Sequence, residues 1–91
     1  DGMVVVVVTL DREGKIASSP DIISRGFIYV KNAEQLISAV RAMTKQIIEK
    51  NDMKNIENWT SVRNRLRDDI GAFLFQKTEK RPMIIPVIIR V

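Results

Sequence analysis

The stretch MVVVVVTL, residues 3–10, decides the fold because it contains five valines in succession. Valine branches at Cβ, and the restricted χ1 angle of such side chains favours strands over helices. In a sheet with one face in water, apolar and polar residues alternate, whereas every residue from Met3 to Val8 is apolar. The stretch therefore predicts a strand that needs burial on both faces.

The other end of the chain has the same character. MIIPVIIRV, residues 83–91, predicts a further strand, and Pro86 interrupts its apolar run from Met83 to Ile89. Because proline has no N–H for a ladder bond, Pro86 predicts an edge strand or a bulge. A domain that starts and stops in bare apolar strand is unusual in water, so we expect residues 1–91 to be a single domain cut from a longer protein.

The segment after the first strand is predicted to form a hairpin. DREG, residues 11–14, is a turn sequence in which Gly14 can adopt a positive φ, and KIAS, residues 15–18, is the expected second strand. Pro20 should end the pairing, and FIYV, residues 27–30, is expected to be extended again.

A mixed stretch, SSPDIISRGF at residues 18–27, has two interpretations. Serine, aspartate, arginine and glycine suit a catalytic or phosphate-binding loop, but Asp and Ser side chains also bond neighbouring backbone N–H groups in turns. No metal ligand or general base lies at a spacing that would complete a site, so a structural bend is the favoured interpretation. The residues assigned to this bend are Pro20, Asp21, Ser24 and Gly26.

Two amphipathic helices are predicted in the second half of the chain. Asn32 and Gln35 have the spacing of a capping box, and their helix should end near Lys50. Asn58 is the expected cap of the second helix, which Pro82 ends. Apolar residues recur at three and four positions, which gives each helix one apolar face. The predicted stripes are Leu36, Ile37, Val40, Met43, Ile47 and Ile48 in the first helix, and Trp59, Val62, Leu66, Ile70, Phe73 and Leu74 in the second.

The element order is therefore β-β-α-α-β. The expected fold is α+β, a three-stranded sheet with two antiparallel helices packed on one face. Helices on one face leave the second apolar face of the sheet uncovered, and a large apolar patch marks an interaction site. We expect that face to contact a second chain or the rest of the parent protein. The sequence leaves open which alternate residues point outward, and the predicted interface residues are Val4, Val6, Val8, Ile85, Val87 and Ile89.

Composition excludes several classes of active site. The chain has no cysteine and no histidine, which removes disulfides, thiolate zinc sites and any His-based triad, and favours an intracellular location. Its longest apolar run is too short to span a bilayer, so no membrane partner is expected. The adjacent carboxylates Asp68 and Asp69 diverge by about 100° on a helix, so they are not a catalytic pair. We predict no catalytic residue, metal ligand or cofactor in this chain.

The net charge of +4 arises in the last third of the chain. Residues 1–58 carry eight basic and eight acidic side chains, whereas residues 59–91 carry seven basic and three acidic ones. A local basic excess suits an acidic partner such as RNA, although such a charge is also common on proteins that bind no nucleic acid. The RNA-binding candidates are Arg63, Arg67, Lys80 and Arg81.

Three blocks of the sequence, DGMVVVVVTLD, PDIISRGFIYV and KTEKRPMIIPVIIRV, resemble the closing segment of ribonuclease J, a ribonuclease of the metallo-β-lactamase/β-CASP family. The resemblance covers the whole chain, with the blocks in the family's order. It implies a parent enzyme that hydrolyses RNA at a zinc site built from His and Asp. Such enzymes act as exonucleases and endonucleases in mRNA decay and rRNA maturation. The motif of that zinc site is not in this chain, so no catalytic residue is carried over.

The resemblance and the uncovered sheet face lead to the same expectation. They imply a non-catalytic C-terminal domain that supports subunit association and full activity of a cytoplasmic, zinc-dependent ribonuclease. The expected partners are the parent's own domains and further copies in a homo-oligomer, and the zinc belongs to the parent. The alternative is an RNA-contacting module that guides substrate toward the parent's metal site.

Overall fold

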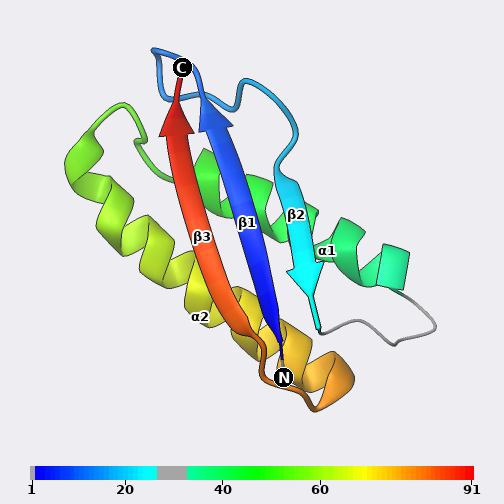
Figure 1. Ribbon diagram of the computed structural model, residues 1–91. Helices are drawn as coiled ribbons and strands as arrows, with labels where there is room; N and C mark the ends of the chain where they lie inside the picture. Colours follow the sequence, from blue (N-terminus) through cyan, green and yellow to red (C-terminus); the bar gives the residue numbers. More distant parts are fainter. Residues whose placement is uncertain (1, 27–32) are drawn as a thin grey trace.

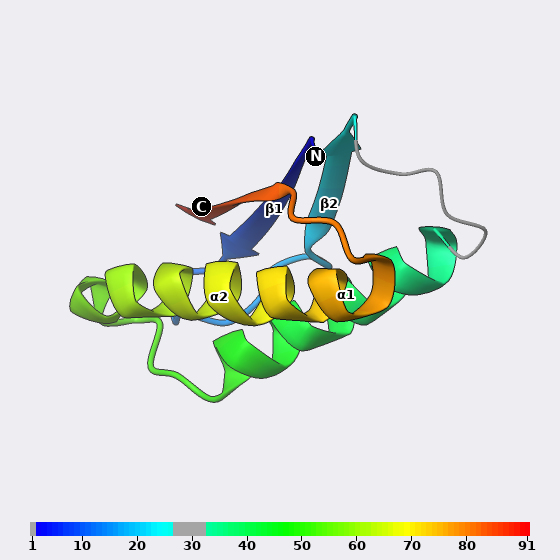
Figure 2. The same ribbon diagram turned by 90° about the horizontal axis from the view of Figure 1, so that it is seen from below.

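The fold has two layers, one of strands and one of helices. The computed structural model describes residues 2–26 and 33–91 of the chain. Figure 1 shows the strands side by side, and Figure 2 shows both helices on the same side of the sheet, running in opposite directions. The predicted α+β architecture and element order are confirmed. The elements are β1 (Met3–Leu10), β2 (Asp21–Arg25), α1 (Ala33–Glu49), a 3₁₀ turn (Ile56–Asn58), α2 (Trp59–Thr78) and β3 (Met83–Arg90).

The valine run forms the central strand, because the sheet order is β2-β1-β3. β1 pairs antiparallel with β2, and Val5 lies opposite Ile23. It pairs parallel with β3, and Val5 lies opposite Ile85. A parallel pair needs a long crossover connection, which the two helices supply on one side of the sheet.

Pro86 lies in an edge strand, as its missing N–H predicted. The N–H of Met83 donates to the Gly2 carbonyl and the N–H of Val91 donates to the Leu10 carbonyl, both at 2.9 Å. Because bonding alternates along a parallel ladder, the odd-numbered residues of β3 bond β1 and the even-numbered ones direct their backbone groups to the free edge. The nitrogen of Pro86 therefore points to the free edge, and the ladder loses no bond.

The segment after β1 turns as predicted, but it does not form the predicted strand. Gly14 has a φ of 80°, and its N–H donates to the Asp11 carbonyl at 3.1 Å. Residues 15–18 then contribute an isolated bridge to β1, through Ile16, and no strand. The expected extended segment at residues 27–30 lies outside the described residues.

The bend predicted within residues 18–27 is wrong for Asp21–Arg25, because these residues form β2. Pairing with β1 explains the difference. Ile22 lies opposite Val6 and Ile23 lies opposite Val5, so two β-branched residues of the short strand meet valines of the long one. Such cross-strand pairs stabilise a sheet, and they outweigh the turn-forming character of the flanking polar residues.

The core lies between the sheet and the helices. Val4, Val6, Val8 and Leu10 of β1 point to the helices and are at most 3% exposed. Thr44 is a buried polar residue of α1, and its hydroxyl is satisfied because it donates to the Val40 carbonyl at 2.8 Å. The predicted apolar faces of the helices are confirmed, since their buried apolar residues are Val40, Ile48, Val62, Leu66, Ile70 and Leu74.

The capping of α2 differs from the prediction. Asn58 stands at its N-cap, but the Asn58 side-chain amide donates to the Asp52 carbonyl at 2.8 Å and makes no capping bond. Asn55 instead caps the preceding 3₁₀ turn by accepting the N–H of Glu57 at 3.0 Å. Asn32, the predicted cap of α1, lies outside the described residues.

Candidate association surface

The side of the sheet that faces away from the helices is the main candidate site. Neighbouring strand residues that lie directly opposite each other point to the same face, so the register fixes which residues belong to it. Figure 2 shows that both helices lie on the other side. We call this surface the open sheet face, and its residues are Met3, Val5, Val7 and Thr9 of β1, Asp21, Ile23 and Arg25 of β2, and Met83, Ile85, Val87 and Ile89 of β3.

Apolar side chains of the open sheet face are far more exposed than those of the core. Met83 is 65% exposed, Ile23 46% and Ile89 43%, whereas Val6 on the opposite face of β1 is fully buried. Val5 and Val7 are partly covered by the strands beside them. The charged residues of this face are confined to β2, at the rim. The surface is thus a continuous apolar patch, which is the usual mark of an interaction site.

The predicted interface residues divide between the two faces of the sheet. Ile85, Val87 and Ile89 lie on the open sheet face. Val4, Val6 and Val8 point to the helices and are buried in the core of this chain, so their assignment to a partner-facing surface is wrong. The reason is the register: Val5 is opposite Ile85, so odd-numbered residues of both strands share a face. The β1 residues that a partner can reach are Met3, Val5, Val7 and Thr9.

The four residues assigned to the bend do not converge on a site. Pro20 is buried, and its carbonyl accepts a hydrogen bond from Arg41 Nε at 3.0 Å. Asp21 lies on the open sheet face, whereas Ser24 lies opposite Val4 and points to the helices. Gly26 follows β2 with a φ of 68°, the left-handed conformation expected for a glycine that redirects the chain.

The predicted RNA-binding residues are spread along α2 and beyond its end. Arg63 donates to the Thr60 hydroxyl at 3.1 Å, and Arg67 forms an exposed ion pair with Asp68 at 3.3 Å. The Arg81 guanidinium lies over the Phe75 ring, 4.0 Å from its centroid, after the helix has ended. Since a helix rises 1.5 Å per residue, Arg63 and the end of α2 are roughly 22 Å apart. The basic residues therefore form a dispersed band, and they do not form a compact pocket.

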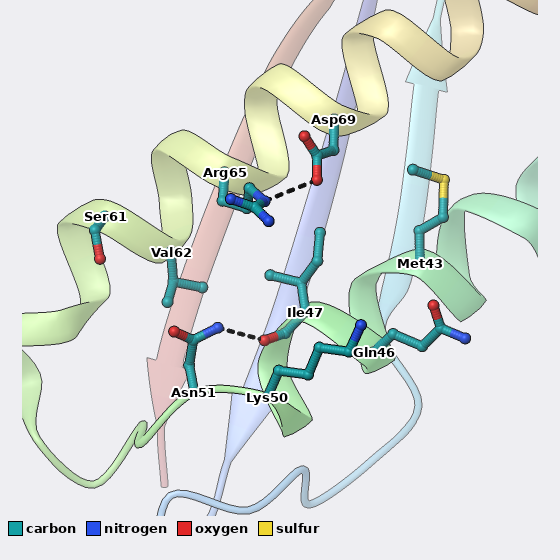
Figure 3. Close-up of a pocket in the computed structure, with 9 residues that line it drawn as sticks. All are labelled: Met43, Gln46, Ile47, Lys50, Asn51, Ser61, Val62, Arg65 and Asp69. Carbon is teal, nitrogen blue, oxygen red and sulfur yellow. Dashed lines mark hydrogen bonds and ion pairs between the residues drawn. The ribbon is translucent and has the colours of Figure 1, made fainter.

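A groove of about 470 Å³ lies between the two helices, on the side away from the sheet (Figure 3). Arg65 Nε pairs with Asp69 Oδ2 at 3.0 Å across its wall, and the Asn51 amide donates to the Ile47 carbonyl at 2.7 Å. The guanidinium and the carboxylate of the wall neutralise each other, and the Arg65 side chain is 69% exposed and that of Asp69 45%. The charges in the groove are therefore an ordinary ion pair between neighbouring turns of α2, which is a common feature of an exposed helix.

Zinc chemistry does not fit the residues present. Within residues 2–26 and 33–91, no three His, Cys, Asp or Glu side chains gather as metal ligands, and the sequence has neither His nor Cys. In the same two segments, no helix combines the length and the apolar character needed to cross a bilayer. The surface that stands out in this domain is therefore the open sheet face.

Comparison with known proteins places the domain in a family. The model of the ribonuclease J C-terminal domain matches residues 1–91, which is the whole chain. The chain belongs to this family. The ribonuclease J C-terminal domain described here is 41% identical to Ribonuclease J2 of Bacillus subtilis over 93 aligned positions. It is 40% identical over 89 positions to proteins named Ribonuclease J 2 from Staphylococcus epidermidis and Staphylococcus aureus.

These matches cover nearly all of this chain but little of each relative. The domain is covered completely by the B. subtilis match and to 97% by the staphylococcal ones. It spans 17% of the length of the first relative and 16% of the other two. The relatives are ribonucleases by name, and the resemblance to ribonuclease J is confirmed as membership of its C-terminal domain family.

Proposed function

We propose that this domain is a non-catalytic association module of a ribonuclease J-type enzyme and that it docks through the open sheet face. The observation that carries the proposal is the apolar character of this face beside a core that is already complete on the other side. In this proposal the catalytic zinc centre lies in other parts of the longer enzyme. The domain supports RNA cleavage in the cytoplasm by holding subunits or domains together in a homo-oligomer.

The dimensions of the face predict a modest interface. Two strands about 26 Å long and a third about 17 Å long, spaced about 4.8 Å apart, present a projected area of roughly 330 Å². A standard protein–protein interface buries about 800 Å² per partner, so this face alone supports a weak, concentration-dependent association. In the complete enzyme we expect further contacts to add to it.

Association is favoured over RNA guidance by the geometry of the two candidate surfaces. The apolar residues of the open sheet face form one continuous patch across three strands. The basic candidates are dispersed, and Arg67 is already paired with Asp68. Single-stranded RNA sites combine a basic groove with aromatic platforms, and the exposed ring of Phe75 already lies under Arg81.

Neighbouring valines on the two faces of β1 provide the test. Val5→Asp places a charge on the open sheet face, where it stays in water in the monomer but must be desolvated in a complex. We expect this variant to keep a cooperative thermal transition and to lose association in sedimentation equilibrium. Val6→Asp buries the same charge in the core and should unfold the domain, as judged by circular dichroism.

Comparison of the Val5→Asp and Val6→Asp variants separates an effect on folding from an effect on docking. A Val5→Asp variant that folds and associates like the unmodified chain would contradict the proposed function. A domain that remains monomeric at every concentration up to about 1 mM would contradict the homo-oligomer and leave docking on other domains of the longer enzyme.

A further inference from the structure

We propose that Met3 and Met83 form a paired oxidation site, and that conversion of their thioethers to sulfoxides by peroxide weakens docking on the open sheet face. This inference rests on the proposed function and adds a reversible covalent modification that regulates the same face. It follows from where the four methionines of the chain lie and from the kind of side chain that surrounds two of them.

Two of the methionines lie side by side at one end of the open sheet face. Met3 of β1 and Met83 of β3 are directly opposite each other in the parallel pair, and Figure 1 shows both strands beginning at the same end of the sheet. Neighbouring strands are about 4.8 Å apart, so the two thioethers share one small area of the surface. Met83 is 65% exposed and Met3 38%, whereas Met53 is 1% exposed in the core. Because oxidation follows exposure, peroxide in solution reaches this pair directly and Met53 only when the domain opens.

The other apolar side chains of the face are of a different kind. All of them are β-branched and aliphatic, which suits a strand and leaves no sulfur for an oxidant to attack. They are Val5, Val7, Ile23, Ile85, Val87 and Ile89. Among the described residues of the face, thioethers occur at Met3 and Met83 alone. The face therefore combines an apolar area that resists oxidation with a single reactive spot.

The reaction is a two-electron oxidation of sulfur. A lone pair of the methionine sulfur attacks one oxygen of hydrogen peroxide, the O–O bond breaks, and the second oxygen leaves as water with both peroxide protons. The sulfur is oxidised to the sulfoxide and the peroxide is reduced. Methionine sulfoxide reductases, one for each sulfoxide epimer, reverse the change. In that reaction two thiols become a disulfide and the sulfoxide oxygen leaves as water.

Oxidation changes the balance between the free face and the docked face. In the free domain each sulfoxide oxygen lies in water, whereas docking removes that water, and burying a polar group without a hydrogen bond is unfavourable. The two sulfoxides are adjacent, so both penalties fall on the same contact area. A docked partner covers both sulfurs, so the reaction captures the free form and mass action draws further chains out of the complex.

Peroxide treatment of the 91-residue chain tests the site. We expect peptide mass spectrometry to find sulfoxide first at Met83 and Met3, more slowly at the half-buried Met43 and last at Met53. With both residues of the pair oxidised, the dissociation constant in sedimentation equilibrium should rise about tenfold or more. Circular dichroism should still show a cooperative thermal transition, because neither residue belongs to the core. Treatment with both reductases should restore the original dissociation constant.

Matched variants separate the pair from the other methionines. Met3→Leu/Met83→Leu keeps the face apolar at a similar volume, so it should associate like the unmodified chain and not respond to peroxide. Met43→Leu removes a methionine from the groove between α1 and α2 (Figure 3) and should respond to peroxide like the unmodified chain. Met83→Gln places a polar side chain on the face without any oxidant and should raise the dissociation constant about threefold or more.

Protection by docking gives a second, independent readout. At a chain concentration tenfold above a dimer dissociation constant, mass action leaves about a fifth of the chains free. Oxidation of Met3 and Met83 should then be about fivefold slower than in a dilute solution. Oxidation of Met43, which lies on the helix side, should proceed at the same rate in both solutions.

The results distinguish a failure of this site from a failure of the proposed function. A chain that associates equally well after both residues are oxidised retains the proposed function and overturns the oxidation site. A Met3→Leu/Met83→Leu variant that still dissociates in peroxide, or a Met53 that is oxidised before the pair, overturns it as well. An unoxidised chain that stays monomeric contradicts the homo-oligomer. Peroxide mapping of the complete enzyme then decides, and equal oxidation of the pair in the enzyme and in the domain overturns the site.

Discussion

At the scale of single residues, two glycines with similar backbone angles are expected to differ in how much they tolerate a side chain. Gly14 has a φ of 80° and Gly26 has a φ of 68°. At either position, an L-residue with a side chain would have to adopt a left-handed backbone conformation, which costs free energy. A Cβ at Gly14 would lie 2.3 Å from Lys54 N and 2.7 Å from the Met53 carbonyl carbon. At Gly26 the nearest atom would be Gly2 Cα, at 3.6 Å, which is an ordinary contact.

We therefore expect Gly26→Ala to lower the free energy of unfolding by about 1 kcal/mol, the cost of the backbone angle alone. Gly14→Ala should lower it by about 3 kcal/mol or more, because the backbone of residues 53–54 has to move as well. Urea denaturation of both variants measures the difference. Equal losses would show that the turn at residues 11–14 does not pack against residues 53–54 in solution.

At the scale of the elements, we expect Pro86 to protect the free edge of β3 from pairing with another strand. Its nitrogen points outward, where an N–H would otherwise be free to pair with another strand. Pro86→Val adds that donor and should leave the free energy of unfolding within about 1 kcal/mol of its original value. We expect faster aggregation at equal concentration, measured by light scattering. Unchanged aggregation would mean that Pro86 does not guard the edge.

The elements differ in how far the sequence alone predicts them. The helices follow from local periodicity, since residues such as Val62, Leu66 and Ile70 repeat at the helical spacing whatever they pack against. β2 could not be located in this way, because its five residues become a strand through pairing with β1. The sequence also could not show which β1 residues lie on the open sheet face, because an unbroken valine run has no alternation of apolar and polar residues. Only the register with β3 identifies Val5 and Val7 as residues of that face.

At the scale of the whole molecule, a chain of 91 residues builds its core on one side of the sheet only. A domain of this size buries a smaller share of its surface on folding than a larger domain does, so its stability by itself is modest. Covering the open sheet face would therefore add stability as well as hold a partner. Folding and association are expected to be linked for this reason.

The linkage makes the melting temperature depend on chain concentration. At concentrations about a hundredfold above the dimer dissociation constant, association should stabilise each chain by roughly 1 kcal/mol, which raises the melting temperature of a domain this size by about 5 °C. The Val5→Asp variant, whose new charge blocks the face, should melt at the same temperature at every concentration. Sodium sulfate should enlarge the rise for the unmodified chain, because excluded salts strengthen apolar burial. A melting temperature that is independent of concentration in both proteins would show that the face contributes nothing to stability through association.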